Sequence, residues 1–168
     1  PWAAIAQDVE IDITITEGEL KAACANKMGI ATMGLGGVFN FMAKKQGLAH
    51  LPLFDEIEWH GRNVNVCFDS DAASNPMVKA AESMLCRCLL KLGAKPRIIR
   101  LPAINGLEKT GLDDWLAEQA DPKQAFDAMV AAHEPYDSMT LELHRLNEEL
   151  VVVDHPACVV QLADNKHI

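Results

Sequence analysis

The chain has 168 residues, of which 49% are hydrophobic and 23% charged, a composition typical of globular proteins that excludes an intrinsically disordered chain. Its formal net charge of −9 excludes a protein that simply coats nucleic acid with a basic surface. No apolar run approaches the roughly 20 residues of a membrane helix, so we expect no membrane partner.

The ends and the cysteines indicate where the protein works. The segment PWAAIAQDVEID at the N-terminus has neither the basic region nor the long apolar stretch of a signal peptide. The five cysteines form no C-x-x-C pair, which favours reduced thiols over a disulfide framework or a zinc site. We therefore expect a cytoplasmic protein. Because the sequence lacks an initiator Met, we also expect it to be part of a longer chain.

The first elements predicted are a strand, a helix and a second strand. β-Branched residues alternate over 11–16, and Thr16 has the spacing of a capping box with Glu19. The helix would cover 19–28. Its buried face would consist of Leu20, Ala23, Cys24 and Met28. The segment 29–37 predicts a short strand that ends in glycines.

A loop or small insertion at 38–62 precedes a third strand at 63–68 and a long helix. Asn75 is predicted as the N-cap of this helix, with Pro76 at its first position. The helix would continue to about Leu92 and end at Gly93. Its inward residues would be Met77, Ala81, Met84, Leu85, Cys88 and Leu92.

The remaining elements complete an α/β pattern. We expect a fourth strand at 96–102, a helix from Thr110 to about Gln119 that Thr110 caps, and a helix from Pro122 to about Ala132 that Asp121 caps. Strands separated by helices predict a parallel sheet of about four strands flanked by helices.

The last part of the chain differs in character. Residues 110–168 carry 12 acidic and three basic side chains, whereas residues 1–109 carry 12 of each. The segment 138–150 predicts a helix, and 151–162 predicts a hairpin with its turn at Asp154, His155 and Pro156. We interpret 1–135 as the catalytic domain and 136–168 as a C-terminal extension that begins a following domain.

Acidic residues follow two of the predicted strands. Glu17 comes after the first strand, and Asp69 and Asp71 come directly after the third. In a parallel sheet these positions share one edge, where ligands bind. Two carboxylates so close repel each other unless a cation neutralises them, and carboxylate oxygens are preferred ligands of Mg²⁺. The pattern therefore predicts a magnesium site, with Mn²⁺ as an alternative.

Each of these residues also has a purely structural interpretation. The carboxylate of Glu17 would interact with the positive end of the dipole of the following helix, Asp69 would lie in a turn, and Asp71 would cap a helix. Asp113 has capping-box spacing from Thr110. Gly36 and Gly37 would serve only as turn residues. The basic residues between 79 and 109 would form either a phosphate-facing patch or a solvated helix face.

The segments ITITEGELKAACA, MGIATMGLGG, RNVNVCFDSDAASNP and GLEKTGLDDWLAE, in this order, resemble the Toprim domain of primases, topoisomerases and OLD nucleases. The resemblance covers residues 10–120 and is strongest to Toprim-like domains of phage and plasmid replication proteins, which usually precede a helicase-type ATPase domain. It implies that Glu17, Asp69 and Asp71 are catalytic and that these three bind metal together with Asp113. Since an acidic residue does not immediately follow Lys109, either Asp113 or Asp114 takes the later acidic role.

The resemblance further implies a Mg²⁺-dependent nucleotidyltransferase of the DNA primase type, acting on nucleotides and single-stranded DNA. Phosphate contacts would come from Lys109, Arg100, Gly36 and Gly37. A helicase domain in the same parent chain would be a partner. The alternatives are a Toprim-type nuclease and a catalytically inactive module that binds nucleic acid or a protein partner.

Overall fold

The computed structural model describes residues 2–43, 47–104, 108–136, 150–154 and 157–161. The chain divides into two compact units, Pro1–Tyr136 and Asp137–Ile168. In the second unit, β5 (Leu150–Asp154) and β6 (Ala157–Gln161) pair in antiparallel fashion, as the hairpin pattern predicts. The helix predicted over 138–150 lies outside the described residues, except for Leu150, which begins β5.

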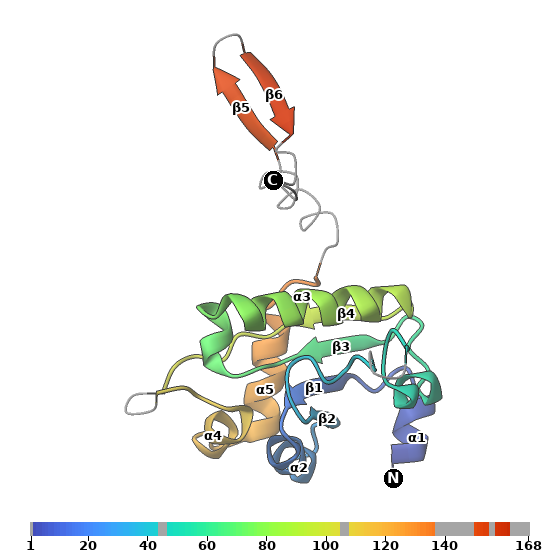
Figure 1. The fold of residues 1–168 in the computed structure, drawn as a ribbon. Coiled ribbons are helices and arrows are strands. Elements are labelled where there is room, and N and C mark those ends of the chain that lie inside the picture. The colour runs from blue at the N-terminus through green and yellow to red at the C-terminus, as the bar shows by residue number, and fades with distance from the viewer. Residues whose placement is uncertain (1, 44–46, 105–107, 137–149, 155–156, 162–168) are drawn as a thin grey trace. The chain divides into compact units, whose positions relative to one another are not determined.

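The first unit is built on a parallel sheet of four strands, which confirms the predicted α/β class. The strands are β1 (Ile13–Glu17), β2 (Thr32–Leu35), β3 (Asn63–Val66) and β4 (Lys95–Ile98), and their spatial order is β2-β1-β3-β4 (Figure 1). The register places Ile15 opposite Met33 and Val66. All four strands therefore end at the same edge of the sheet.

Helices cover both faces of this sheet. They are α1 (Trp2–Gln7), α2 (Glu19–Lys27), α3 (Pro76–Lys91), α4 (Leu112–Ala117) and α5 (Pro122–Ala131), and the described residues also form the short 3₁₀ helices η2 (Pro52–Glu56) and η3 (Ser70–Ala73). In Figure 1, α3 lies along one side of the sheet and α2, α4 and α5 lie toward the other. Among the described residues, no helix has the length and apolar character needed to cross a membrane.

The alternation of side chains along the strands produces two cores. Ile13, Ile15, Val64 and Val66 pack in one cluster with α3 residues such as Leu85 and Leu89. The second cluster, between α2, α4 and α5, contains Ala25, Leu112, Trp115, Leu116 and Phe126. The strands are thus buried on both faces, as expected for a parallel sheet.

The helix α1 and the 3₁₀ helix η2 were not predicted, and a buried arginine explains how α1 is held. The guanidinium group of Arg62 donates hydrogen bonds to the carbonyl oxygens of Ile5, Ala6 and Ile11 at 2.9–3.1 Å. The side chain of Arg62 is fully buried. Because these bonds join residues more than 50 positions apart, no local pattern could indicate them.

Two of the predicted helix caps are wrong. Thr16 lies buried within β1, and the N-cap of α2 is Gly18, at φ 91°. Gly111, not Thr110, caps α4, and its N–H donates to the carboxylate of Asp114 at 2.9 Å. In contrast, the side chains of Asn75 and Asp121 cap α3 and α5 as predicted.

The buried helix faces also differ in part from the prediction. Leu20 of α2 is 84% exposed and Met77 of α3 is 66% exposed, although both were expected to face inward. The buried positions are Ala22 and Ala25 in α2 and Val78, Ala81, Glu82, Leu85, Cys86 and Leu89 in α3. In α2 the inward stripe consists of small residues because the helix lies close against β2, which leaves no room for a leucine.

Candidate active site

Two of the predicted site residues, Glu17 and Asp69, meet at the carboxyl edge of the sheet. Glu17 is the last residue of β1, and Asp69 follows β3 and precedes η3. Asp69 is only 2% exposed, whereas the side chain of Glu17 is 21% exposed. The parallel topology brings these carboxylates together from positions 52 residues apart in the sequence.

Two lysines neutralise this carboxylate pair. Lys21 Nζ forms an ion pair with Asp69 Oδ1 and lies 3.6 Å from Glu17 Oε1. Lys109 Nζ lies 2.7 Å from Asp69 Oδ2 and 3.5 Å from Glu17 Oε1. The centre therefore consists of two carboxylates and two ammonium groups, and Asp69 lies between the ammonium groups.

Different elements position the two lysines. Lys21 lies in the first turn of α2, four residues after Glu17, so the turn of the helix brings its side chain back over the end of β1. Lys109 precedes Thr110, and the backbone of Thr110 is joined to Ser70 of η3. Ser70 N–H donates to the Thr110 carbonyl oxygen at 2.9 Å, and Thr110 N–H donates to Ser70 Oγ at 2.8 Å. This pair of bonds fixes Lys109 beside Asp69.

The environment separates the pKa values of the two acids. Burial raises the pKa of Glu17, and the neighbouring Asp69 raises it further. Burial alone would raise the pKa of Asp69, but interactions with Glu17, Lys109 and Lys21 hold it below its ordinary value. A hydrogen bond with Asp69 raises the pKa of Lys109. Two neighbouring carboxylates whose pKa values are shifted in opposite directions occur in acid–base active sites and also in structural ion-pair networks.

The other predicted metal ligands lie around this centre. Asp71 lies in the first turn of η3, and its charge contributes to the raised pKa of Lys109. Asp113 Oδ1 is buried and accepts no hydrogen bond from any residue that the structure describes. A Cβ atom at Gly111 would lie 2.6 Å from Asp113 Oδ1 and 2.9 Å from Lys21 Cε, so both side chains pack against this glycine. Asp114 instead accepts the hydrogen bond from Gly111 N–H.

Arg100 has a partner outside the carboxylate pair. It forms a bidentate ion pair with Glu82 of α3, in which Nη2 lies 2.7 Å from Oε2. Glu82 is fully buried, whereas the side chain of Arg100 is 37% exposed. Burial raises the pKa of Glu82, and Arg100 opposes this effect. The predicted phosphate contact of Arg100 would therefore compete with a structural role.

Gly36 and Gly37 follow β2 at the same edge of the sheet. A Cβ atom at Gly36 would lie 3.3 Å from Glu19 Oε1 and 3.3 Å from Asn40 Nδ2. The Gly37 carbonyl oxygen accepts a hydrogen bond from Asn40 N–H at 2.9 Å. The loop thus lies beside the N-terminus of α2, next to Glu17.

The carboxylate oxygens of Glu17 and Asp69 are donors of the kind that a hard cation prefers. Asp69 Oδ2 is buried and, among the described residues, contacts Lys109 Nζ at 2.7 Å, which leaves a second lone pair of this oxygen for a cation. Across the described part of the chain, no three His, Cys, Asp or Glu side chains are grouped to hold a metal ion. One or two carboxylates are enough for Mg²⁺ when substrate phosphates and water complete its shell.

Lys21 is the site residue that the sequence analysis missed. The available signal was its position four residues after Glu17, which brings its side chain near the Glu17 carboxylate where the chain turns from β1 into α2. A Glu–Lys pair at this spacing is a common surface feature, so only the tertiary contact with Asp69 distinguishes it.

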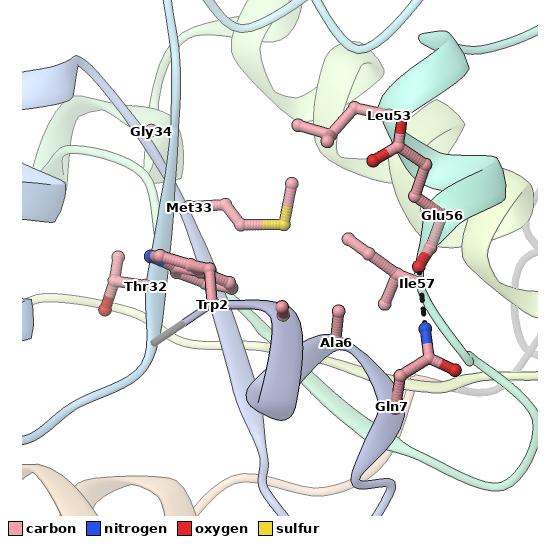
Figure 2. A pocket seen from close by; sticks show the side chains of 10 residues that line it. Trp2, Ala6, Gln7, Thr32, Met33, Gly34, Leu53, Glu56 and Ile57 are labelled. Atoms are coloured by element: carbon pink, nitrogen blue, oxygen red, sulfur yellow. Dashed lines mark hydrogen bonds between the residues drawn. The ribbon is translucent and has the colours of Figure 1, made fainter.

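A cavity of about 680 Å³ lies elsewhere, between α1, β2 and η2. Figure 2 shows Met33 and Leu53 pointing into it and Trp2 and Ala6 facing it from α1. The Gln7 amide donates to the Glu56 carbonyl oxygen at its rim, at 3.0 Å (Figure 2). The residues that line this cavity do not include Glu17, Asp69 or the two lysines that pair with them.

The chain matches a family model and is similar in fold to solved structures. A family model described as "Domain of unknown function (DUF3854)" matches residues 1–123. The chain matches no curated protein. Among solved structures it is similar to the Aquifex aeolicus primase, in a crystal structure of the zinc-binding and RNA polymerase domains, with a TM-score of 0.51 and 16% identity. The match covers 83% of this chain and 30% of that chain, so the chain spans less than a third of that primase chain.

Proposed function

The chain belongs to the family DUF3854, a domain of unknown function, and we propose that it is a Mg²⁺-dependent nucleotidyl-transfer domain of the DNA primase type. The observation that carries the proposal is the pair of Glu17 and Asp69 with Lys21 and Lys109 at the carboxyl edge of a sheet whose fold is similar to that of a primase. Its substrates would be nucleotides and single-stranded DNA.

Each side chain has a role that follows from its surroundings. Asp69, with its lowered pKa, stays ionised and carries negative charge into the centre. Glu17 either holds the metal together with Asp69 or, through its raised pKa, acts as the general base that accepts the proton of an attacking hydroxyl group. Lys109, whose side chain is 52% exposed, is placed to contact a substrate phosphate.

Glu17 and Asp69 would hold the metal, with Asp71 and Asp113 nearby. When bound, Mg²⁺ would neutralise charge that develops on the phosphate oxygens. The contribution of the chain is to keep Asp69 charged and buried, to keep a base next to it and to present ammonium groups toward the substrate. We further propose a phage- or plasmid-type replication protein as the parent, with a helicase domain in the same chain.

The test is the incorporation of labelled nucleotides on single-stranded DNA. We expect Asp69→Ala to reduce incorporation at least about a hundredfold, because it removes the ionised carboxylate. Asp127→Ala is the matched control, since among the described residues Asp127 forms its ion pair with Lys123, on the exposed face of α5. Equal incorporation by the wild-type chain and Asp69→Ala would contradict the proposal. Metal-dependent loss of a plasmid without synthesis would identify a nuclease.

A second candidate function is an inactive module that binds nucleic acid or a protein partner. It is favoured by the pairing of both carboxylates with lysines and by the absence, within the described residues, of a group of three potential metal ligands. A calorimetric titration that shows no Mg²⁺ or Mn²⁺ binding to the folded chain would support this candidate.

A further inference from the structure

The ammonium group of Lys21 lies where a cation between the two acids would lie. It binds Asp69 Oδ1 and is 3.6 Å from Glu17 Oε1. Its side chain is only 20% exposed, so water screens these interactions less than it would on the surface. Lys21 therefore contributes a positive charge held between both carboxylates.

The packing around Lys21 holds it in this place. Its Cε lies against Gly111 at the N-terminus of α4, where a Cβ atom would come within 2.9 Å of it. The helix that carries it is fixed by a second close contact, between Gly34 and the backbone of residues 18 and 19. Lys109 differs, because its side chain is 52% exposed and has room to turn toward solvent or a substrate.

We propose that Lys21 is a built-in counter-cation of the carboxylate pair, which a divalent metal ion must displace in order to bind. The inference rests on the proposed metal-dependent function. Since the ammonium and the metal ion compete for the same two carboxylates, the site would bind a divalent ion weakly while Lys21 is in place. When the ion enters, the displaced ammonium becomes available to an anionic ligand such as a phosphate group.

The experiment measures Mn²⁺ binding to the chain from the electron paramagnetic resonance signal of the free ion. We expect Lys21→Met to bind Mn²⁺ at least about tenfold more tightly than the wild-type chain, because a unit positive charge a few ångströms from the metal position is removed. Lys27→Met is the matched control, since Lys27 is an exposed lysine of the same helix and its loss changes the net charge equally.

Two further variants locate the effect. Adding Asp69→Asn to Lys21→Met should abolish the gain in affinity. If circular dichroism shows that Lys21→Met is unfolded, Lys21→Gln replaces it, because Gln keeps a hydrogen-bond donor for Asp69. We then expect Lys21→Gln to bind Mn²⁺ more tightly than Lys27→Met. Binding by Lys21→Met no tighter than by Lys27→Met would overturn the proposal, as would a gain that survives Asp69→Asn.

The outcome is separable from that of the nucleotide incorporation assay. Tighter Mn²⁺ binding by Lys21→Met, together with no primer synthesis by the wild-type chain, would leave the counter-cation role standing and overturn the proposed reaction. Primer synthesis by the wild-type chain without any gain in Mn²⁺ affinity would overturn the counter-cation role alone.

Discussion

Asp69 and Glu82 are buried carboxylates whose negative charges are compensated by different partners. Asp69 has two lysines and a neighbouring acid, whereas Glu82 depends on Arg100. An ionised group without a partner is costly in a protein interior, so the removal of one partner matters more for Glu82 than for Asp69. This difference makes the ion pair of Arg100 testable through stability.

We expect Arg100→Ala to lower the free energy of unfolding by about 2 to 4 kcal/mol, because it removes the ion-pair partner of the fully buried Glu82. The value lies near the lower end for buried pairs, since the Arg100 side chain is 37% exposed. Urea denaturation measures it. The control is Arg87→Ala in α3, an exposed arginine that forms no ion pair among the described residues. Equal stabilities of the two variants would contradict the argument.

The same variant should show a characteristic pH dependence. The pKa of Glu82 is raised in the folded chain, so its contribution to stability is fully present below its ordinary pKa and is lost as the pH rises through the folded value. Without Arg100 the folded pKa rises further. The destabilisation caused by Arg100→Ala should therefore be smaller at pH 5 than at pH 8. An effect that is larger at pH 5 would indicate another cause.

Among the elements, α2 and β2 set the geometry of the site through one glycine. A Cβ atom at Gly34 would lie 2.8 Å from the Gly18 carbonyl oxygen and 2.9 Å from Glu19 Cα. Both are backbone atoms at the N-terminus of α2, so they cannot move aside as the end of a flexible side chain can. The close approach places Lys21 over the end of β1.

We expect Gly34→Ala to destabilise the chain by about 1 to 3 kcal/mol, because the added methyl group pushes α2 away from the sheet. Gly36→Ala is the matched control, since its Cβ would meet only the side-chain ends of Asn40 and Glu19, at 3.3 Å. Thermal unfolding of both variants measures the difference. Equal transition temperatures would show that α2 is not held by this contact.

For the whole molecule, the boundary of the first unit lies just after a short contact with β4. Tyr136 N–H donates to the Pro96 carbonyl oxygen at 2.8 Å, and Pro135 forms a bridge with Arg97. His133 Nε2 accepts a hydrogen bond from Arg100 N–H at 3.2 Å. Both buried clusters lie within residues 1–136. This unit therefore contains the interactions that a separate domain needs.

We expect a chain cut after Tyr136 to unfold within about 2 °C of the full chain, and a chain cut after Ala132 to unfold about 2 to 8 °C lower than the full chain. The second cut removes the contacts of Pro135 and Tyr136 with β4 and that of His133 with Arg100. Differential scanning calorimetry of the three chains measures this. A large loss from the first cut would show that residues after 136 stabilise the first unit.

The local patterns of the sequence determined the parallel α/β sheet, the caps at Asn75 and Asp121, and the acids at the strand ends. These features depend on neighbouring residues: strand alternation, capping side chains and proline at the first helical position. The caps at Thr16 and Thr110 were predicted wrongly because tertiary structure overrode the local spacing. Thr16 is buried in β1, and Thr110 is joined to Ser70 and Ile104.

Only the tertiary structure decided which charged groups meet. The sequence alone indicated Glu17 and Asp69 as acids at one sheet edge, but not that Lys21 and Lys109 neutralise them or that Arg100 pairs with Glu82. These three ion pairs join residues 18 to 48 positions apart and depend on strand order, helix docking and burial, which no local pattern contains. The sequence therefore indicated the acids of the site, whereas only the tertiary structure showed which charged groups pair.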